Sequence, residues 1–139
     1  MLNYKKILYA TDLHASCKET LERLLVFANK FDAEVTVLHV IKPISGMYGY
    51  TAGIASDVDL EIEKKAIGQL QELMNTVGLD KAQAIIRKGQ YSNAIIEHAD
   101  DENIDAIVLN GHTHNIFARM GSTEDCVINN AHCDVIVSR

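Results

Sequence analysis

The chain alternates between two hydrophobic periods, and this alternation limits the folds that it can adopt. Five short runs are rich in β-branched and aliphatic residues, and the longest of them reads EVTVLHVI. The segments between them repeat apolar residues every three or four positions, which is the period of an amphipathic helix. Strands that alternate with helices favour a parallel sheet. Strands that are apolar on successive positions are typical of a sheet covered by helices on both faces.

Each segment can be placed by residue number. The expected strands are Tyr4–Ala10, Glu34–Ile41, Gln83–Arg87, Asp105–Leu109 and Cys133–Val137, and the expected helices are Ser16–Phe31, Asp57–Val77, Ser92–Asp101 and Ser122–Asn130. Asp57 and Ser92 are expected to cap the starts of their helices, and Gly78 the end of the second helix. The fold class is therefore α/β, an open doubly wound five-stranded parallel sheet of order 3-2-1-4-5. The 139 residues are expected to form one domain, residues 1–139.

Charge and composition narrow the classes of function. The net charge of −6 and the absence of a long Lys/Arg run disfavour nucleic acid as a partner, and equally an anionic membrane surface. No apolar run approaches the length of a membrane span, and the first residues do not resemble a secretory signal. The three cysteines form no C-x-x-C pair, so reduced thiols in a cytoplasmic protein are expected.

The ligand crevice of such a sheet lies where the strand order reverses, at the carboxyl ends of the first and fourth strands. Thr11 and Asp12 follow the first strand, and Asn110 and Gly111 follow the fourth. For Asp12 we favour hydrogen bonds to its own turn over contact with a ligand. Gly111 is expected chiefly to supply backbone freedom after its strand.

These residues also carry a resemblance to a known family. The segments YKKILYATD, VTVLHVI, DAIVLNGHTH, GST and CDVIVSR follow one another as in universal stress proteins. One branch of that family binds ATP through the motif G-x2-G-x9-G-[ST] after the fourth strand. The other branch, the universal stress protein A type, lacks the motif and is not seen to bind nucleotide.

The chain resembles the A type. Gly111 matches the first glycine, but His114 stands at the second, and only six residues separate it from the pair Gly121-Ser122. A loop three residues short cannot easily wrap a triphosphate, and Glu124 and Asp125 would repel phosphate from the helix that follows. Ser122 is expected to cap that helix. If a nucleotide binds, the resemblance assigns it to the residues Asp12, Val40, Gly111, Gly121 and Ser122.

The resemblance implies a function as well. It implies a cytoplasmic, non-enzymatic stress-response homodimer with weak or no ATP binding and no cofactor. The dimer is expected to form through Cys133–Val137, an unprotected apolar strand at the edge of the sheet. An unknown protein partner remains open. One alternative is a nucleotide-binding member with a degenerate pocket, and a weaker one is an adenine-nucleotide-handling enzyme.

The histidines allow a further hypothesis. His14, His112 and His114 would crowd the same mouth as Asp12, and imidazoles with a carboxylate suit zinc. Solvated loop histidines are the favoured interpretation, so no metal is expected. His39 is expected to be a hydrogen-bonded core residue. His98 and His132 are expected at the surface or as helix caps.

Overall fold

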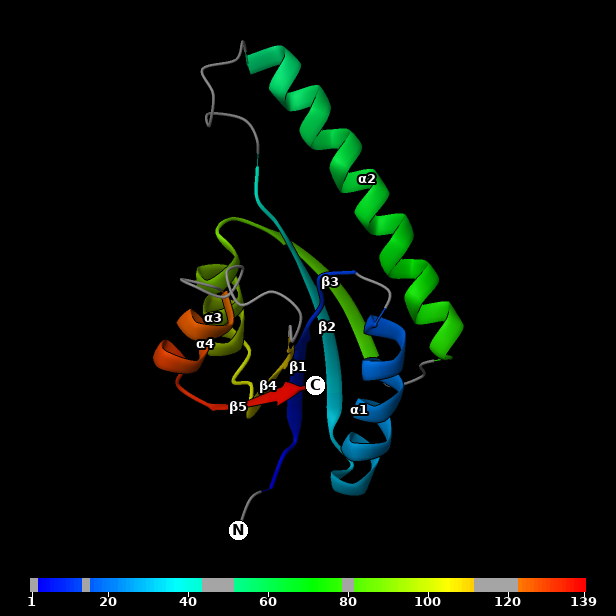
Figure 1. Ribbon diagram of the computed structural model, residues 1–139, viewed down its shortest axis with the longest axis vertical. Helices are drawn as coiled ribbons and strands as arrows, with labels where there is room; N and C mark the ends of the chain where they lie inside the picture. The colour runs from blue at the N-terminus through cyan, green and yellow to red at the C-terminus, as the bar shows by residue number, and fades with distance from the viewer. Residues whose placement is uncertain (1–2, 14–15, 44–51, 79–81, 112–122) are drawn as a thin grey trace.

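Nine helices and strands make up the computed structural model, which describes residues 3–13, 16–43, 52–78, 82–111 and 123–139 (Figure 1). The strands are β1 (Lys6–Ala10), β2 (Glu34–Ile41), β3 (Ala82–Lys88), β4 (Ala106–Asn110) and β5 (Asp134–Ser138). The helices are α1 (Cys17–Phe31), α2 (Ala52–Val77), α3 (Tyr91–Asp101) and α4 (Thr123–Asn130). Each strand begins within two residues of its expected start.

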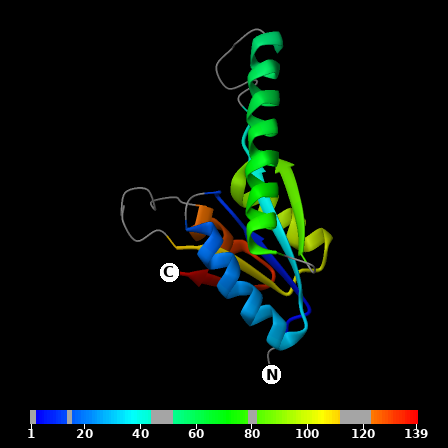
Figure 2. The same cartoon turned by 90° about the vertical axis from the view of Figure 1, so that its right-hand side faces the viewer.

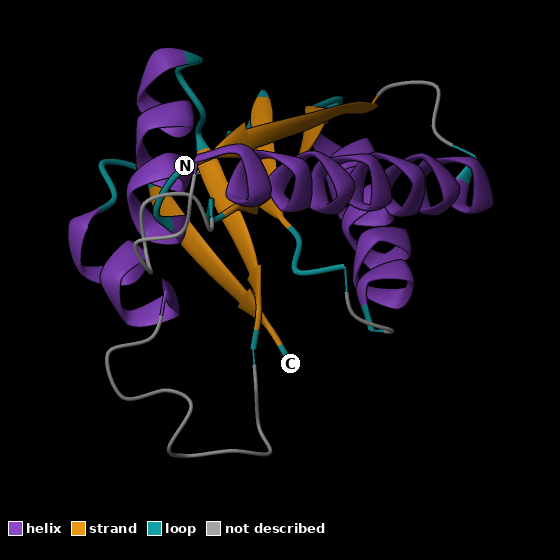
Figure 3. Cartoon of the chain, turned by 90° about the horizontal axis from the view of Figure 1, so that it is seen from above, coloured by secondary structure: helices purple, strands orange, loops and turns teal. Residues whose placement is uncertain are grey.

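The sheet has the expected order and direction. Its strands run β3-β2-β1-β4-β5, and all four neighbouring pairs are parallel. Helices α1 and α2 lie on one face of the sheet, and α3 and α4 on the other (Figure 1). The view from above shows the C-terminus at the end of a strand (Figure 3), and the strand order makes that strand, β5, an edge. The fold class predicted from the sequence is confirmed.

Two apolar clusters hold the helices to the sheet, and β1 contributes to both. Ile7 and Tyr9 belong to the cluster under α1 and α2, whereas Leu8 belongs to the cluster under α3 and α4. This division follows from the pleat, which turns successive side chains to opposite faces. All three side chains are fully buried. A central strand covered on both faces therefore needs apolar residues at successive positions, as the sequence has.

Helix α2 is longer than its hydrophobic period predicts. It begins at Ala52, so Asp57 lies inside the helix and the predicted cap is wrong. Figures 1 and 2 both show the first half of α2 extending beyond the strands. Leu60 in that half is 52% exposed, whereas Leu70 further along is buried. Because the early turns cover no core, they need no apolar stripe that would reveal them in the sequence.

The ends of two helices decide the remaining boundary predictions. Gly78 ends α2 with φ +67°, and its N–H donates to Met74 O at 3.1 Å, so its role as C-cap is confirmed. Helix α3 instead begins at Tyr91, after Gln90 in an extended conformation. Ser92 is therefore the second helical residue and is buried, and its predicted capping role is wrong. None of the described helices is long and apolar enough to cross a membrane.

Truncation of Ile107 should reveal how much the second cluster contributes to stability. Ile107 is 0% exposed on β4, so Ile107→Ala should lower the free energy of unfolding in urea by about 2–5 kcal/mol. Ile128→Ala on α4 is the matched control, because Ile128 is 49% exposed, and it should change stability by less than about 0.5 kcal/mol. Equal losses in the two variants would contradict this description of the core.

Candidate functional site

The carboxyl ends of β1 and β2 are joined by polar contacts just beyond the apolar core. The N–H of Thr11 donates to Leu38 O at 2.8 Å. The carbonyl of Thr11 lies 3.0 Å from Nδ1 of His39. The prediction that His39 is hydrogen-bonded is confirmed, although its side chain is only partly buried. These contacts fix the direction in which the chain leaves β1 toward Asp12.

Asn110 ties the end of β4 to helix α1. Its side-chain N–H₂ donates to Ser16 Oγ and to Thr20 Oγ1, each at 3.2 Å. Its Oδ1 accepts a hydrogen bond from the hydroxyl of Tyr9, a fully buried side chain. Burial raises the pKa of Tyr9 well above its ordinary value, so the hydroxyl remains a donor. Sequence reasoning missed Tyr9 and Thr20; a lone tyrosine hydroxyl in an aliphatic strand was the available signal.

Cys17 connects the first turn of α1 to Asp12. Its Sγ lies 2.7 Å from Thr11 Oγ1 and donates to Asp12 Oδ1 at 3.1 Å. Burial raises the pKa of the Cys17 thiol, which keeps the sulfur protonated rather than nucleophilic. The carboxylate of Asp12 thus has a local partner five residues along the chain. This contact agrees with the preferred interpretation of Asp12 as a residue that stabilises its own turn.

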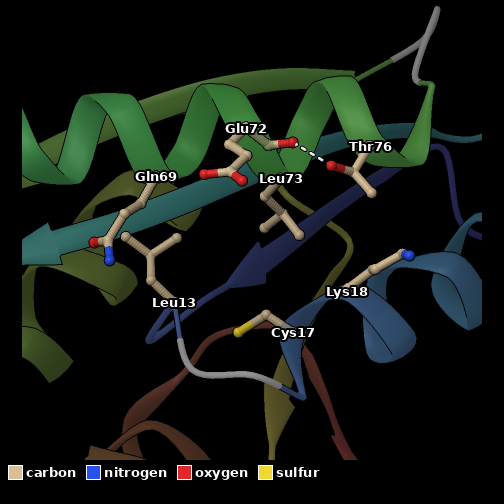
Figure 4. Close-up of a pocket in the computed structure, with 7 residues that line it drawn as sticks. All are labelled: Leu13, Cys17, Lys18, Gln69, Glu72, Leu73 and Thr76. Atoms are coloured by element: carbon tan, nitrogen blue, oxygen red, sulfur yellow. Dashed lines mark hydrogen bonds between the residues drawn. The ribbon is translucent and has the colours of Figure 1, made fainter.

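A pocket opens beside this turn, between the first turn of α1 and the second half of α2 (Figure 4). Its volume is about 310 Å³, and its lining residues are Leu13, Cys17, Lys18, Gln69, Glu72, Leu73 and Thr76. Leu13 has φ +62°, an uncommon conformation for a leucine, and its N–H donates to Thr11 Oγ1 at 3.0 Å. All of these residues except Leu13 belong to α1 or α2, and they include both apolar and polar side chains. The sequence did not reveal this pocket, because it depends on how two helices pack.

Three of the five residues that the resemblance assigned to a nucleotide, Asp12, Val40 and Gly111, lie in the described part of the chain. Val40 is 5% exposed and belongs to the apolar cluster under α3 and α4, so its side chain contributes to the core. Gly111 follows β4, but it is not one of the described glycines with a positive φ, so the expectation that it chiefly supplies backbone freedom is wrong. Its N–H donates to Ser138 O at 2.6 Å. A Cβ atom on Gly111 would lie 3.0 Å from Arg139 Cγ and 3.2 Å from Ser138 O. A side chain at this position would therefore be tight against the end of β5 and Arg139.

Several predicted residues lie outside the described part of the chain. They are His14, His112, His114, Gly121 and Ser122. The hypotheses of a metal site and of a Ser122 cap therefore stay predictions. Glu124 and Asp125 do occupy the first turn of α4, as expected. Within the described residues, no group of three or more His, Cys, Asp or Glu side chains could hold a metal ion.

Comparison with known proteins agrees with this fold. Residues 3–139 match the Universal stress protein family. A relative from Coxiella burnetii named universal stress protein A homolog 1 is 33% identical over 97% of this chain and 96% of its own. The structure of the universal stress protein UspA from Lactobacillus plantarum is 26% identical, covers both chains completely and superposes with a TM-score of 0.76. The structure of a universal stress protein in complex with cAMP is 18% identical, covers 99% of this chain and 98% of its own, and has a TM-score of 0.73.

The chain belongs to the universal stress protein family. The resemblance inferred from the ordered segments is confirmed, and the curated relative carries the name of the A type. The family assignment also supports the broad expectation of a role in the stress response.

Alanine at two glycines should have opposite effects on stability. Gly111→Ala should lower the free energy of unfolding by about 1–3 kcal/mol, because the end of β5 must move away from the new methyl group. Gly68→Ala is the control: it lies inside α2 with no neighbouring atom within 4 Å of its Cβ position, so it should gain about 0.5–1 kcal/mol. Thermal or urea unfolding of both variants checks the difference. A neutral or stabilising Gly111→Ala would show that packing does not require the glycine.

Proposed function

We propose that the chain is a stress-response protein of the A type that acts as a homodimer without enzymatic activity and binds ATP weakly or not at all. The observation that carries this proposal is the acidic first turn of α4, where Glu124 and Asp125 stand. A helix N-terminus attracts phosphate through its free N–H groups. Two carboxylates satisfy that same preference within the chain and repel a triphosphate.

Two further features support weak ATP binding. The sequence has His114 at the second glycine position, and its loop is three residues shorter than the ATP motif. Gly111, the one matching glycine before that loop, has a packing role against β5 that needs no ligand. The thiol of Cys17, buried and protonated, supports the absence of a cysteine-based reaction at this edge of the sheet.

The alternative function is the binding of an adenine monophosphate. The structural neighbour in complex with cAMP, and another from Archaeoglobus fulgidus in complex with dAMP, favour an adenine monophosphate over ATP. A monophosphate needs less of the loop after β4 than a triphosphate does. The neighbours are 18% and 20% identical to this chain, with TM-scores of 0.73 and 0.63.

Calorimetric titration distinguishes these functions. Purified protein at pH 7.5 should give no heat of binding with ATP, or a dissociation constant weaker than about 100 μM, which corresponds to less than about 5.5 kcal/mol of binding free energy. ADP, AMP, cAMP and dAMP are titrated in parallel. Saturation by a monophosphate alone would support the alternative, and a sub-micromolar constant for ATP would overturn the proposal.

The homodimer is proposed from the position of β5. This strand pairs with β4 on one side only and forms an edge of the sheet. Its sequence DVIVS has no proline, and its single charged residue lies at the first position. An edge of this kind offers unpaired N–H and C=O groups to a second strand. Two copies related by a twofold axis would pair their β5 strands antiparallel.

The direction of each backbone group along β5 follows from one contact. Ser138 O accepts from Gly111 N, so the backbone groups of Ser138 face β4. Alternate residues of a strand turn their backbone groups to opposite sides. Val135 and Val137 therefore present theirs to the open edge, where a second copy would pair.

Proline at Val135 should abolish the dimer while preserving the β4–β5 ladder. Light scattering should return twice the chain mass for the parent at 50 μM, and the single-chain mass for Val135→Pro, because proline lacks the outward N–H. Val135→Ala removes the side chain but keeps that N–H, so this control should remain dimeric. A parent protein of single-chain mass, or a dimer that survives Val135→Pro with the fold intact, would contradict pairing through β5.

A further inference from the structure

His98 is a buried histidine without a hydrogen-bond partner. Its side chain lies on α3 and is only 3% exposed. Neither Nδ1 nor Nε2 finds a partner in the described structure. The expectation of a surface or capping role is therefore wrong. Its position near the end of a helix suggested exposure, but the i, i+3, i+4 spacing places it with Ala94, Ile95 and Ala99 on the face that is buried.

The surroundings of this ring favour its neutral form. An unpaired polar group in an apolar site is costly, and a charged one is far more so. Burial is the largest cause that lowers the pKa of His98, and the charge of Arg87 on β3 lowers it further. Glu102, which follows α3, and Asp101, its last residue, act in the opposite direction. Helix α4 and strand β2 also pack against α3 but contribute no charged group to this set in the described residues.

The two carboxylates that favour a charged His98, those of Asp101 and Glu102, are weakened by their own surroundings. Arg87 Nη2 lies 3.1 Å from Asp101 Oδ2, so this carboxylate has a permanent cation beside it. Glu102 is exposed to solvent, which screens its charge. Neither carboxylate accepts a hydrogen bond from the imidazole. A proton on His98 would thus remain uncompensated as long as α3 stays packed on the sheet.

We propose that His98 makes α3 an acid-released clamp, in which protonation of the buried imidazole loosens α3 from the sheet. Loosening exposes the ring to water, where the charged form is solvated. The same movement disturbs the cluster that contains Val40 and Val127, since both pack with residues of α3. Helix α4 would follow, because it packs against α3. The clamp would therefore couple acidity to the elements that flank the crevice, whether or not a nucleotide binds there.

A second histidine nearby has the opposite surroundings. Nδ1 of His132 lies 3.1 Å from both carboxylate oxygens of Asp100, and its side chain is mostly exposed. Its predicted surface location is confirmed. The ring of His132 therefore has both the carboxylate partner and the access to water that the buried ring of His98 lacks. His132 is consequently the matched control for His98.

The direction of the pH effect follows from proton binding. The unfolded chain binds a proton at His98 near pH 6.5, whereas the folded chain does so only at lower pH because the pKa is lowered. Stability from this residue is therefore fully present above pH 6.5 and falls as the pH drops from there toward the folded pKa. Within that window the unfolding equilibrium constant should increase by up to about tenfold for each pH unit.

Urea unfolding at pH 7.5, 6.5, 6.0 and 5.5 tests the clamp. The unfolding constant of the parent should increase at least threefold more between pH 7.5 and 5.5 than that of His98→Leu, which cannot titrate and fills a similar volume. His132→Gln should not reduce the acid-induced loss. Hydrogen exchange should show faster opening of α3 at pH 5.5 than at pH 7.5 in the parent, and no such change in His98→Leu.

Two results would overturn the proposal. One is an imidazole NMR titration of the parent that places the pKa of His98 at or above that of a free histidine. The other is an unchanged pH dependence in His98→Leu. If His98→Leu does not fold, His98→Gln replaces it as a polar variant that cannot be protonated. The NMR titration is done on the parent protein, and a variant is needed only to assign the His98 signal.

Discussion

Burial of the sheet on both faces is the constraint on which the rest of the structure depends. Side chains such as Leu8 and Tyr9, neighbours in sequence, enter different clusters and are both inaccessible to water. Polar groups can then be satisfied mainly where the strands end. Thr11 and Asn110 stand at those ends and bond to groups of β2 and α1. At the crevice, therefore, the chain can carry polar side chains without placing them in the apolar core.

The same constraint explains how much could be predicted from the sequence. Apolar residues at successive positions identified all five strands, and the order of the sheet followed from rules of connection. The start of α2 was wrong because its first turns extend beyond the strands, where no sheet core sets the hydrophobic pattern. His98 was misplaced because a polar residue near a helix end usually faces water. Burial of a polar side chain depends on tertiary packing, which a local pattern does not report.

The candidate site could be located but not described from the sequence. Asp12 and Gly111 were expected at the crevice, and the structure places both there. Their contacts were unforeseen: Cys17 reaches Asp12 from the first turn of α1, and the end of β5 approaches Gly111 from a distant part of the sequence. Gly111 illustrates the difference: backbone freedom was expected of it, whereas the structure shows its N–H bonded to Ser138 O and its Cβ position close to the end of β5. A glycine that matches a ligand motif can therefore be maintained by packing alone.

The projecting half of α2 gives the molecule an uneven distribution of local stability. Around Leu70 the helix packs on the core, whereas the side chains of Val58 and Leu60 are 40% and 52% exposed to solvent. Fraying of those early turns would sacrifice little buried surface, so they can open without global unfolding. A protease that requires an unwound substrate would then cut α2 well before its anchored half. Such a cut would sever the chain between β2 and β3 while the two strands remain paired in the sheet.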